Sequence, residues 1–228
     1  MNKKLLKKYY EDYKSKYDQI IKQYGEKEGF IVNGILWWDF YDKKITKMVS
    51  KAKEDKLTIE EASEFYKLFG FGPKLYGNTF IEQGIEKIKK LFIFLLDETI
   101  PAKQKINEIV EEPENENYFR GVGISFVTLF LTSIFPRKYV QWNSQTDGAL
   151  KLLEAYPRRE RGERKSSFYG KINRICKEIA ETLGIQELTK LDNLLFCTNR
   201  GYLDVGTEVI ESIKDEAKTD AMAYIQNS

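Results

Sequence analysis

The sequence predicts an all-α protein, and three observations lead to that prediction. Apolar residues recur at spacings of three and four along most of the 228 residues, which is the pattern of amphipathic helices. Short polar breaks rich in glycine and proline separate these stretches. A hydrophobic content of 42% is enough to bury a sizeable core. We therefore expect a single helical domain over residues 1–228, with a division into two lobes near residues 70–80.

The first part of the chain predicts three helices. Residues 3–24 carry a stripe of apolar residues and tyrosines at helical spacing, and Gly25 ends that helix. Such a stripe can stack on nucleic-acid bases, but it is more typical of packing against a core. Residues 30–38 also favour a helix, because the helical spacing continues through residue 49. Thr58, with glutamates two and three residues later, is typical of a helix cap, so we expect a helix from there to Phe69.

The middle of the chain predicts a loop followed by two helices. Glycine and proline mark a loop at residues 70–73, and a Gly-Asn pair extends it to residues 77–78. Residues 80–97 then predict one long helix with an apolar side. Pro101 starts another helix that reaches about residue 110, and residues 111–117 form an acidic break.

The last part of the chain predicts further helices at residues 168–183 and 187–196. After Gly206 the apolar stripe weakens. We expect the C-terminal tail, residues 204–228, to pack loosely or to lead to a partner domain.

The most informative segment is a Gly-x-Gly turn at Gly121 and Gly123 that opens directly into a long apolar helix. Glycine has no Cβ, so this turn can be tight and another backbone can approach it closely. The free N–H groups and the positive dipole end of the following helix point toward the turn, which makes a cradle for an anion such as a DNA phosphate. The structural alternative is a tight turn between two packed helices.

The order of elements after this turn resembles the helix-hairpin-helix core of the DNA glycosylase superfamily, over residues 104–155. A break at Pro136 ends the apolar helix, and a new helix starts after Asn143. The resemblance implies a catalytic aspartate and, in bifunctional members, a lysine, but this chain has Asn143 and Ser125 at those positions. An amide cannot act as a general base near neutral pH. The inherited chemistry is therefore expected to be absent, and Asp147, one helical turn further on, is the candidate substitute acid.

The same segment is also similar to the helical amino-terminal domains of McrB-type, modification-dependent restriction proteins, a likeness that extends over about residues 60–200. The residues that carry it are Gly121, Gly123, Ser125, Thr128, Pro136, Tyr139, Trp142, Asn143, Thr146, Ala149 and Leu150. The resemblance implies that this domain recognises DNA, while a separate nucleotide-driven motor and nuclease cut it. Under this interpretation an asparagine at position 143 is expected.

Basic residues near these motifs are candidate DNA contacts. The loop at residues 156–165 holds half of the chain's arginines, which can bind phosphates bidentately. The alternative is a solvated loop whose charge is partly cancelled by Glu160 and Glu163. We expect Trp142 and Asn143 to face the base, although a core position and a helix cap are their structural alternatives. The expected DNA-binding residues are Arg120, Gly121, Gly123, Ser125, Arg137, Lys138, Trp142, Asn143, Arg158, Arg159, Arg161 and Arg164.

Composition excludes several classes of function. The chain has no histidine, which removes histidine-based triads and the usual zinc hydrolase sites, and we expect neither a metal nor a cofactor. The formal charge of +2 is too mild to indicate nucleic acid by itself, so any basic patch must be local. Cys176 and Cys197 lie on apolar stretches without paired spacing, which favours a reducing, cytoplasmic location. The polar amino terminus does not suit a secretory signal, and no apolar run suits a membrane span.

Three hypotheses for function follow. The first is a DNA-binding domain, without catalytic activity, that recognises modified or distorted DNA for a restriction or defence system. The second is an active DNA glycosylase that uses Asp147 or another acid. The third is a protein-interaction scaffold with a helical fold.

Overall fold

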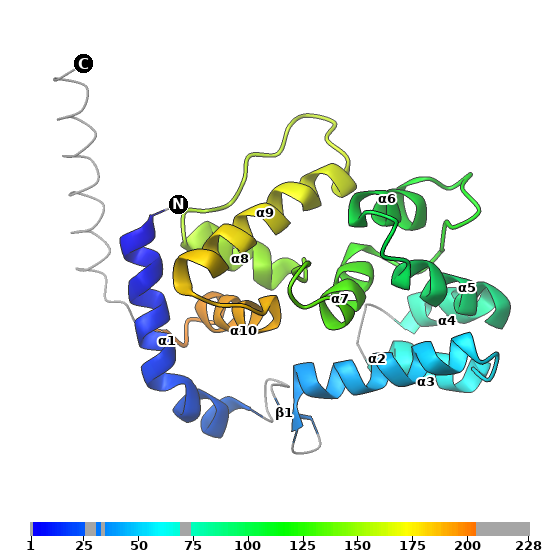
Figure 1. Ribbon diagram of the computed structural model, residues 1–228, viewed down its shortest axis with the longest axis horizontal. Coiled ribbons are helices and arrows are strands. Elements are labelled where there is room, and N and C mark those ends of the chain that lie inside the picture. Colours follow the sequence, from blue (N-terminus) through cyan, green and yellow to red (C-terminus); the bar gives the residue numbers. More distant parts are fainter. Residues whose placement is uncertain (1, 26–30, 33–34, 69–73, 204–228) are drawn as a thin grey trace.

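The computed structural model describes residues 2–25, 31–32, 35–68 and 74–203 (Figure 1). The regular secondary structure of these residues is helical except for one antiparallel pair of two-residue strands, β1 (Ile31–Val32) and β2 (Ile35–Leu36). The prediction of an all-α fold is therefore confirmed. The helices are α1 (Lys3–Tyr24), α2 (Trp37–Lys53), α3 (Ile59–Leu68), α4 (Lys74–Glu82), α5 (Ile85–Leu96), α6 (Ala102–Ile106), the π-helix η1 (Asn107–Glu111), α7 (Ile124–Ile134), α8 (Ser144–Leu152), α9 (Lys165–Leu183) and α10 (Leu188–Asn199).

Local capping signals explain where several helices begin. The Asn2 side chain accepts hydrogen bonds from the backbone N–H groups of Lys4 and Leu5, both at 3.1 Å, and starts α1. Thr58 and Glu61 form a reciprocal capping box at α3, with N–O distances of 3.3 and 3.4 Å. The predicted helix cap at Thr58 is therefore confirmed, and α1 has the predicted bounds.

Three local predictions are wrong. Residues 31–32 and 35–36 form the β1–β2 pair, and α2 begins only at Trp37, because a short apolar run fits either a strand or a helix. The Gly-Asn pair at residues 77–78 lies inside α4 rather than in a loop. The long helix expected at residues 80–97 is divided, because Gly84 has a φ of 82°, outside the helical region, and separates α4 from α5.

The remaining expectations have mixed outcomes. The helix after Pro101 continues through η1 to Glu111, and turns at residues 112–117 form the predicted break. The loop at residues 70–73 and the tail at residues 204–228 lie outside the described residues. Buried apolar side chains form one contiguous cluster from Leu5 to Leu203, and a lobe boundary near residues 70–80 stays a prediction.

The central helix is α7, which lies between α8–α10 on one side and α2–α6 on the other (Figure 1). Every side chain from residue 126 to residue 133 is buried, which is the signature of a helix surrounded by the core. The neighbouring α8 packs closely on α10, because a Cβ on Gly148 would lie 1.8 Å from the Asn199 Oδ1 atom. This packing fixes the start of α8 relative to α7.

Three further features concern buried groups and membrane spans. Cys176 and Cys197 are free and buried. Burial raises the pKa of the Cys197 thiol to about 12. The buried Lys105 donates from Nζ to the Leu95 carbonyl at 2.6 Å, and desolvation lowers its pKa to about 8.

None of the described helices has the length and apolar character that a bilayer span requires.

Candidate nucleic-acid interface

The turn at residues 119–123 connects η1 to α7 and is held from several directions. The Phe119 N–H donates to the Ile109 carbonyl of η1 at 3.0 Å, and the Phe119 side chain is buried. The Val122 N–H donates back to the Phe119 carbonyl at 3.3 Å, and the Val122 side chain is also buried. Gly121 has a φ of 84°, and its carbonyl accepts from the Tyr66 hydroxyl at 2.6 Å. This left-handed position favours glycine.

The start of α7 carries no side-chain cap among the described residues. Gly123 is the N-cap, with extended backbone angles (φ −108°, ψ 177°), and a Cβ placed there would meet nothing within 4 Å. The first N–H groups of a helix have no partner within the helix itself. Among the first N–H groups of α7, that of Phe126 donates to the Gly123 carbonyl at 3.1 Å, whereas those of Ile124 and Ser125 have no partner within the described chain. The positive end of α7 beside the turn therefore suits an anion.

Ser125 lies in the first turn of α7, but its hydroxyl contacts another segment. It donates from Oγ to the Trp142 carbonyl at 3.2 Å. Thr128, one turn later, accepts from the Trp142 N–H at 3.0 Å. Both residues therefore join α7 to the segment before α8.

Trp142 belongs to the core. Its side chain is 7% exposed, and its ring lies 5.4 Å from the Phe168 ring. Its indole Nε1 donates to Asp147 Oδ1 at 2.7 Å. Of the two expectations for Trp142, the structure supports the core position rather than a side chain that faces a base.

Asn143 caps α8, which is one of the two roles predicted for it. Its Oδ1 atom accepts from the N–H groups of Gln145 at 2.9 Å and Thr146 at 3.0 Å. The carbonyl end of this amide is therefore used to start the helix.

Asp147 is partly buried and faces aromatic residues rather than a second acid. Besides the bond from Trp142, it interacts with Tyr156, and burial followed by the Asp147 charge raises the pKa of that phenol. These contacts hold the start of α8 against Trp142. They give Asp147 a positioning role in the fold.

The arginine loop at residues 156–164 is anchored by contacts within the loop and with η1 and the residue that follows it. Arg164 donates to Asn107 Oδ1 at 2.6 Å and forms an ion pair with Glu112 at 3.0 Å. Arg159 donates to the Glu163 carbonyl at 3.0 Å, and its guanidinium lies 5.5 Å from the Phe168 ring centroid. Both arginines therefore have partners within the protein.

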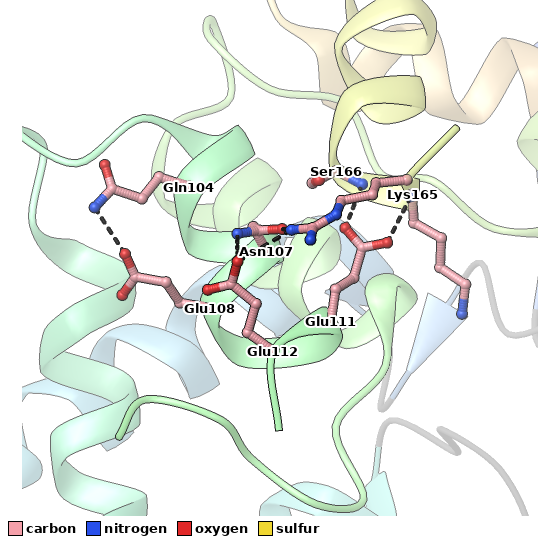
Figure 2. Close-up of polar contacts among 8 residues, drawn as sticks. Gln104, Asn107, Glu108, Glu111, Glu112, Lys165 and Ser166 are labelled. Carbon is pink, nitrogen blue, oxygen red and sulfur yellow. Dashed lines mark hydrogen bonds and ion pairs between the residues drawn. The ribbon is translucent and has the colours of Figure 1, made fainter. Parts of the chain in front are cut away.

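The start of α9 is capped by Glu111, which comes from η1. Its carboxylate accepts from the N–H groups of Lys165 at 2.7 Å and Ser166 at 3.0 Å (Figure 2). Burial alone would raise the pKa of Glu111, but the hydrogen bonds from Ser166 and Lys165 and the charge of Arg164 lower it overall. The anion that this helix start attracts is already supplied by the protein.

The other predicted cations differ in their surroundings. The side chains of Arg120, Arg137, Arg158 and Arg161 are exposed, and within the described chain none of them makes a hydrogen bond or an ion pair. Lys138, in contrast, forms an ion pair with Glu98. The arginine that directly precedes the turn, Arg120, is thus available to a ligand.

Two lysines that the sequence did not single out lie beside the turn. Lys87 and Lys90 of α5 line a hollow of about 400 Å³ that Asn117 and Phe119 also line. Glu86 and Glu116 line the same hollow, so its lining carries both charges. The Lys87 Nζ atom lies 5.8 Å from the Phe119 ring centroid. The helical spacing of these lysines indicates an exposed face of α5, but no local signal indicates that this face adjoins the turn.

No match to this chain was found among protein-family models, curated proteins or solved structures. Among the described residues, no three side chains of His, Cys, Asp and Glu come together as metal ligands would. Near the turn the surface offers backbone donors and cations. This is the chemistry of anion binding.

Proposed function

We propose that this protein binds DNA through the turn at residues 119–123 and the start of α7, and that it does so without catalysing a reaction there. The observation that carries the proposal is the uncapped start of α7 at Gly123, where a Cβ would meet nothing within 4 Å. A phosphate oxygen placed there accepts hydrogen bonds from the helix-initial N–H groups and is stabilised by the helix dipole. This is how the hairpin of helix-hairpin-helix proteins would act in this chain.

Cations beside the turn support the same proposal. Arg120 is exposed and directly precedes Gly121. Lys87 and Lys90 line the hollow next to Phe119. Phosphates one or two nucleotides away on the same strand would lie near these charges, so binding should weaken as salt concentration rises.

The polar residues of the α8 start support a binding role rather than catalysis. Asn143 uses its amide oxygen in the helix cap, and Asp147 accepts the indole N–H of Trp142. Neither group is a solvent-facing acid placed beside the turn. We propose that the DNA is modified or distorted, and that the protein serves a cytoplasmic restriction or defence system in which a partner motor and nuclease cut the DNA.

Substitution of Gly123 by Asp gives a sharp test. The extended backbone at Gly123 suits any residue, and Asp is a better N-cap than Gly by a few tenths of a kcal/mol. The same carboxylate occupies the phosphate position and repels DNA. We expect unchanged or slightly higher thermal stability together with a loss of duplex affinity of about tenfold or more.

The matched control is Gly170→Asp, which adds the same charge to α9 at an exposed glycine that has nothing within 4 Å of an added Cβ. Affinity is measured by fluorescence anisotropy at several salt concentrations, with duplexes that carry unmodified, methylated or oxidised bases. Equal affinities for the two variants would overturn the proposed site. The products are checked for released base, and release that Asp147→Asn abolishes would show a glycosylase instead.

A further inference from the structure

A second cavity, remote from the turn in sequence, lies between α1 and the start of α10. Its volume is about 560 Å³, within the range of small-molecule sites. Tyr10, Tyr13 and Tyr17 line it from α1, and Asn193 lines it from α10. We call it the tyrosine cavity. Lys14 and Lys190 also line it, one from each of the two helices.

The three tyrosines form a continuous aromatic wall. Tyr10 and Tyr13 are stacked, with ring centroids 6.4 Å apart and an angle of 18° between their planes. Tyr13 and Tyr17 meet edge to face, with centroids 5.2 Å apart. Burial, followed by the neighbouring phenol of Tyr17, raises the pKa of Tyr13, so its hydroxyl stays neutral. A wall of this kind suits a planar ring that stacks on it or packs edge to face.

Asn193 presents an oriented donor to this cavity. Its Oδ1 atom accepts from Trp37 Nε1 at 2.8 Å. An indole N–H can only donate, so this bond assigns the amide oxygen to Trp37 and leaves the amide nitrogen as the remaining donor of this cavity-lining side chain. That nitrogen can donate to a carbonyl oxygen or an unprotonated ring nitrogen, which are the acceptors on the edges of nucleobases.

The charges around the cavity favour an anion. Lys190 forms an ion pair with Glu187 at 3.4 Å, so the charge of Glu187 is balanced. Lys14 lies 4.8 Å from the Tyr10 ring centroid and leaves a net positive charge at the rim. The start of α10 adds little to this charge, because its N-cap residue is Glu187 and the Leu188 N–H already donates to the Pro136 carbonyl at 2.6 Å. The N–H groups of Lys190 and Leu191 donate to the Glu187 carbonyl.

We propose that the tyrosine cavity binds a nucleotide. Its base packs on the tyrosine wall and accepts a hydrogen bond from Asn193, while its phosphate lies near Lys14. The ligand is either a free nucleotide or one unit of a single strand. This site is separate from the turn at residues 119–123, so each proposal stands or fails by its own experiment.

The test is a titration of the full chain with AMP, GMP, CMP, UMP and ten-residue oligomers of dA and dT, followed by calorimetry and by tryptophan fluorescence. Because Trp37 is hydrogen-bonded to Asn193, its emission should report occupancy. Asn193→Asp keeps the acceptor for Trp37 but replaces the donor by a charge. We expect it to lower affinity by about tenfold. Tyr17→Ala should have a similar effect, whereas Tyr17→Phe keeps the ring and should retain binding.

The outcomes distinguish a free nucleotide from a single strand as the ligand, and they distinguish this site from the site at the turn. Binding of a mononucleotide that both Asn193→Asp and Tyr17→Ala weaken supports a free nucleotide as the ligand. Binding of the oligomers alone, weakened by the same variants, supports a strand. No binding of any probe at millimolar concentration, or binding that neither variant changes, overturns the proposal. Gly123→Asp should leave nucleotide affinity unchanged while it weakens duplex binding, so a failure of one site is distinguishable from a failure of the other.

Discussion

The starts of α7 and α9 share arginine and glycine in the preceding loop, but among the described residues only the start of α9 is capped by a side chain. Each helix follows a loop that contains arginine and glycine, and the sequence predicts phosphate contacts for arginines of both loops. At α9, the Glu111 carboxylate accepts two backbone N–H groups, and Arg164 is paired with Glu112 (Figure 2). At α7, no side chain caps Gly123 within the described chain, and Arg120 is exposed.

The difference shows that basic residues near a helix start do not by themselves define an anion site. Glu111 lies 54 residues before Lys165 in the sequence, and the fold brings its charge to the α9 start. An external phosphate would have to displace a carboxylate that is already hydrogen-bonded there. At the α7 start the N–H groups of Ile124 and Ser125 have no such acceptor among the described residues. The predicted phosphate contacts therefore fall into two groups. Those beside the turn have no partner in the described part of the protein, whereas those at the α9 start already bind other residues of the protein.

The largest expected effect comes from removing the α9 cap. Glu111→Ala leaves the N–H groups of Lys165 and Ser166 without their acceptor and removes a negative charge that interacts with Arg164. We expect the free energy of unfolding at pH 7 to fall by about 2 kcal/mol. Urea denaturation measures this change. A variant as stable as the original protein would show that water replaces the cap without cost.

The same carboxylate predicts a pH dependence. The pKa of Glu111 is lower in the folded protein than its ordinary value of 4.5. Its ionised form therefore stabilises the fold fully above pH 4.5, and this contribution is lost as pH falls through the folded pKa. The difference in unfolding free energy between the original protein and Glu111→Gln should be constant near neutral pH and shrink in acid. A difference that grows in acid would have the wrong sign for this cap.

A smaller effect is expected at the turn that presents α7. Gly121 has a φ of 84°, so Gly121→Ala places a Cβ in the left-handed region at a cost of about 1 kcal/mol. Gly123→Ser is the matched control, because its backbone is extended, its Cβ would meet nothing, and serine is a favourable N-cap residue. Thermal unfolding should separate the two variants. Equal stabilities would indicate that the turn relaxes around the new methyl group.

Local signals in the sequence were enough to predict the helix starts that local side chains cap. Asn143 and the Thr58–Glu61 pair act within three residues of their own positions, so periodicity and capping rules identify them. The apolar run after Gly123 likewise predicts a buried helix.

Contacts between distant segments could not be predicted in this way. The Glu111 cap depends on how η1 packs against α9, and the Lys87 and Lys90 hollow depends on how α5 adjoins the turn. The sequence around Trp142 is compatible with either a base contact or a core position. Only the contacts of Trp142 with Phe168 and Asp147 in the folded chain distinguish these two roles. The break at Gly84 between α4 and α5 was not predicted, because the apolar residues before and after it keep a helical spacing.

The smallest expected effect compares one arginine from each helix start. Arg120→Gln removes an exposed cation beside the open start of α7, so the salt dependence of duplex binding should become shallower by about one ion. Arg164→Gln removes a cation that Asn107 and Glu112 already bind, and the salt dependence should stay the same. Anisotropy titrations across a salt series measure both slopes. If Arg164→Gln had the larger effect, DNA would have to compete successfully with Glu112 for that arginine, and the arginine loop rather than the turn would be the main phosphate contact.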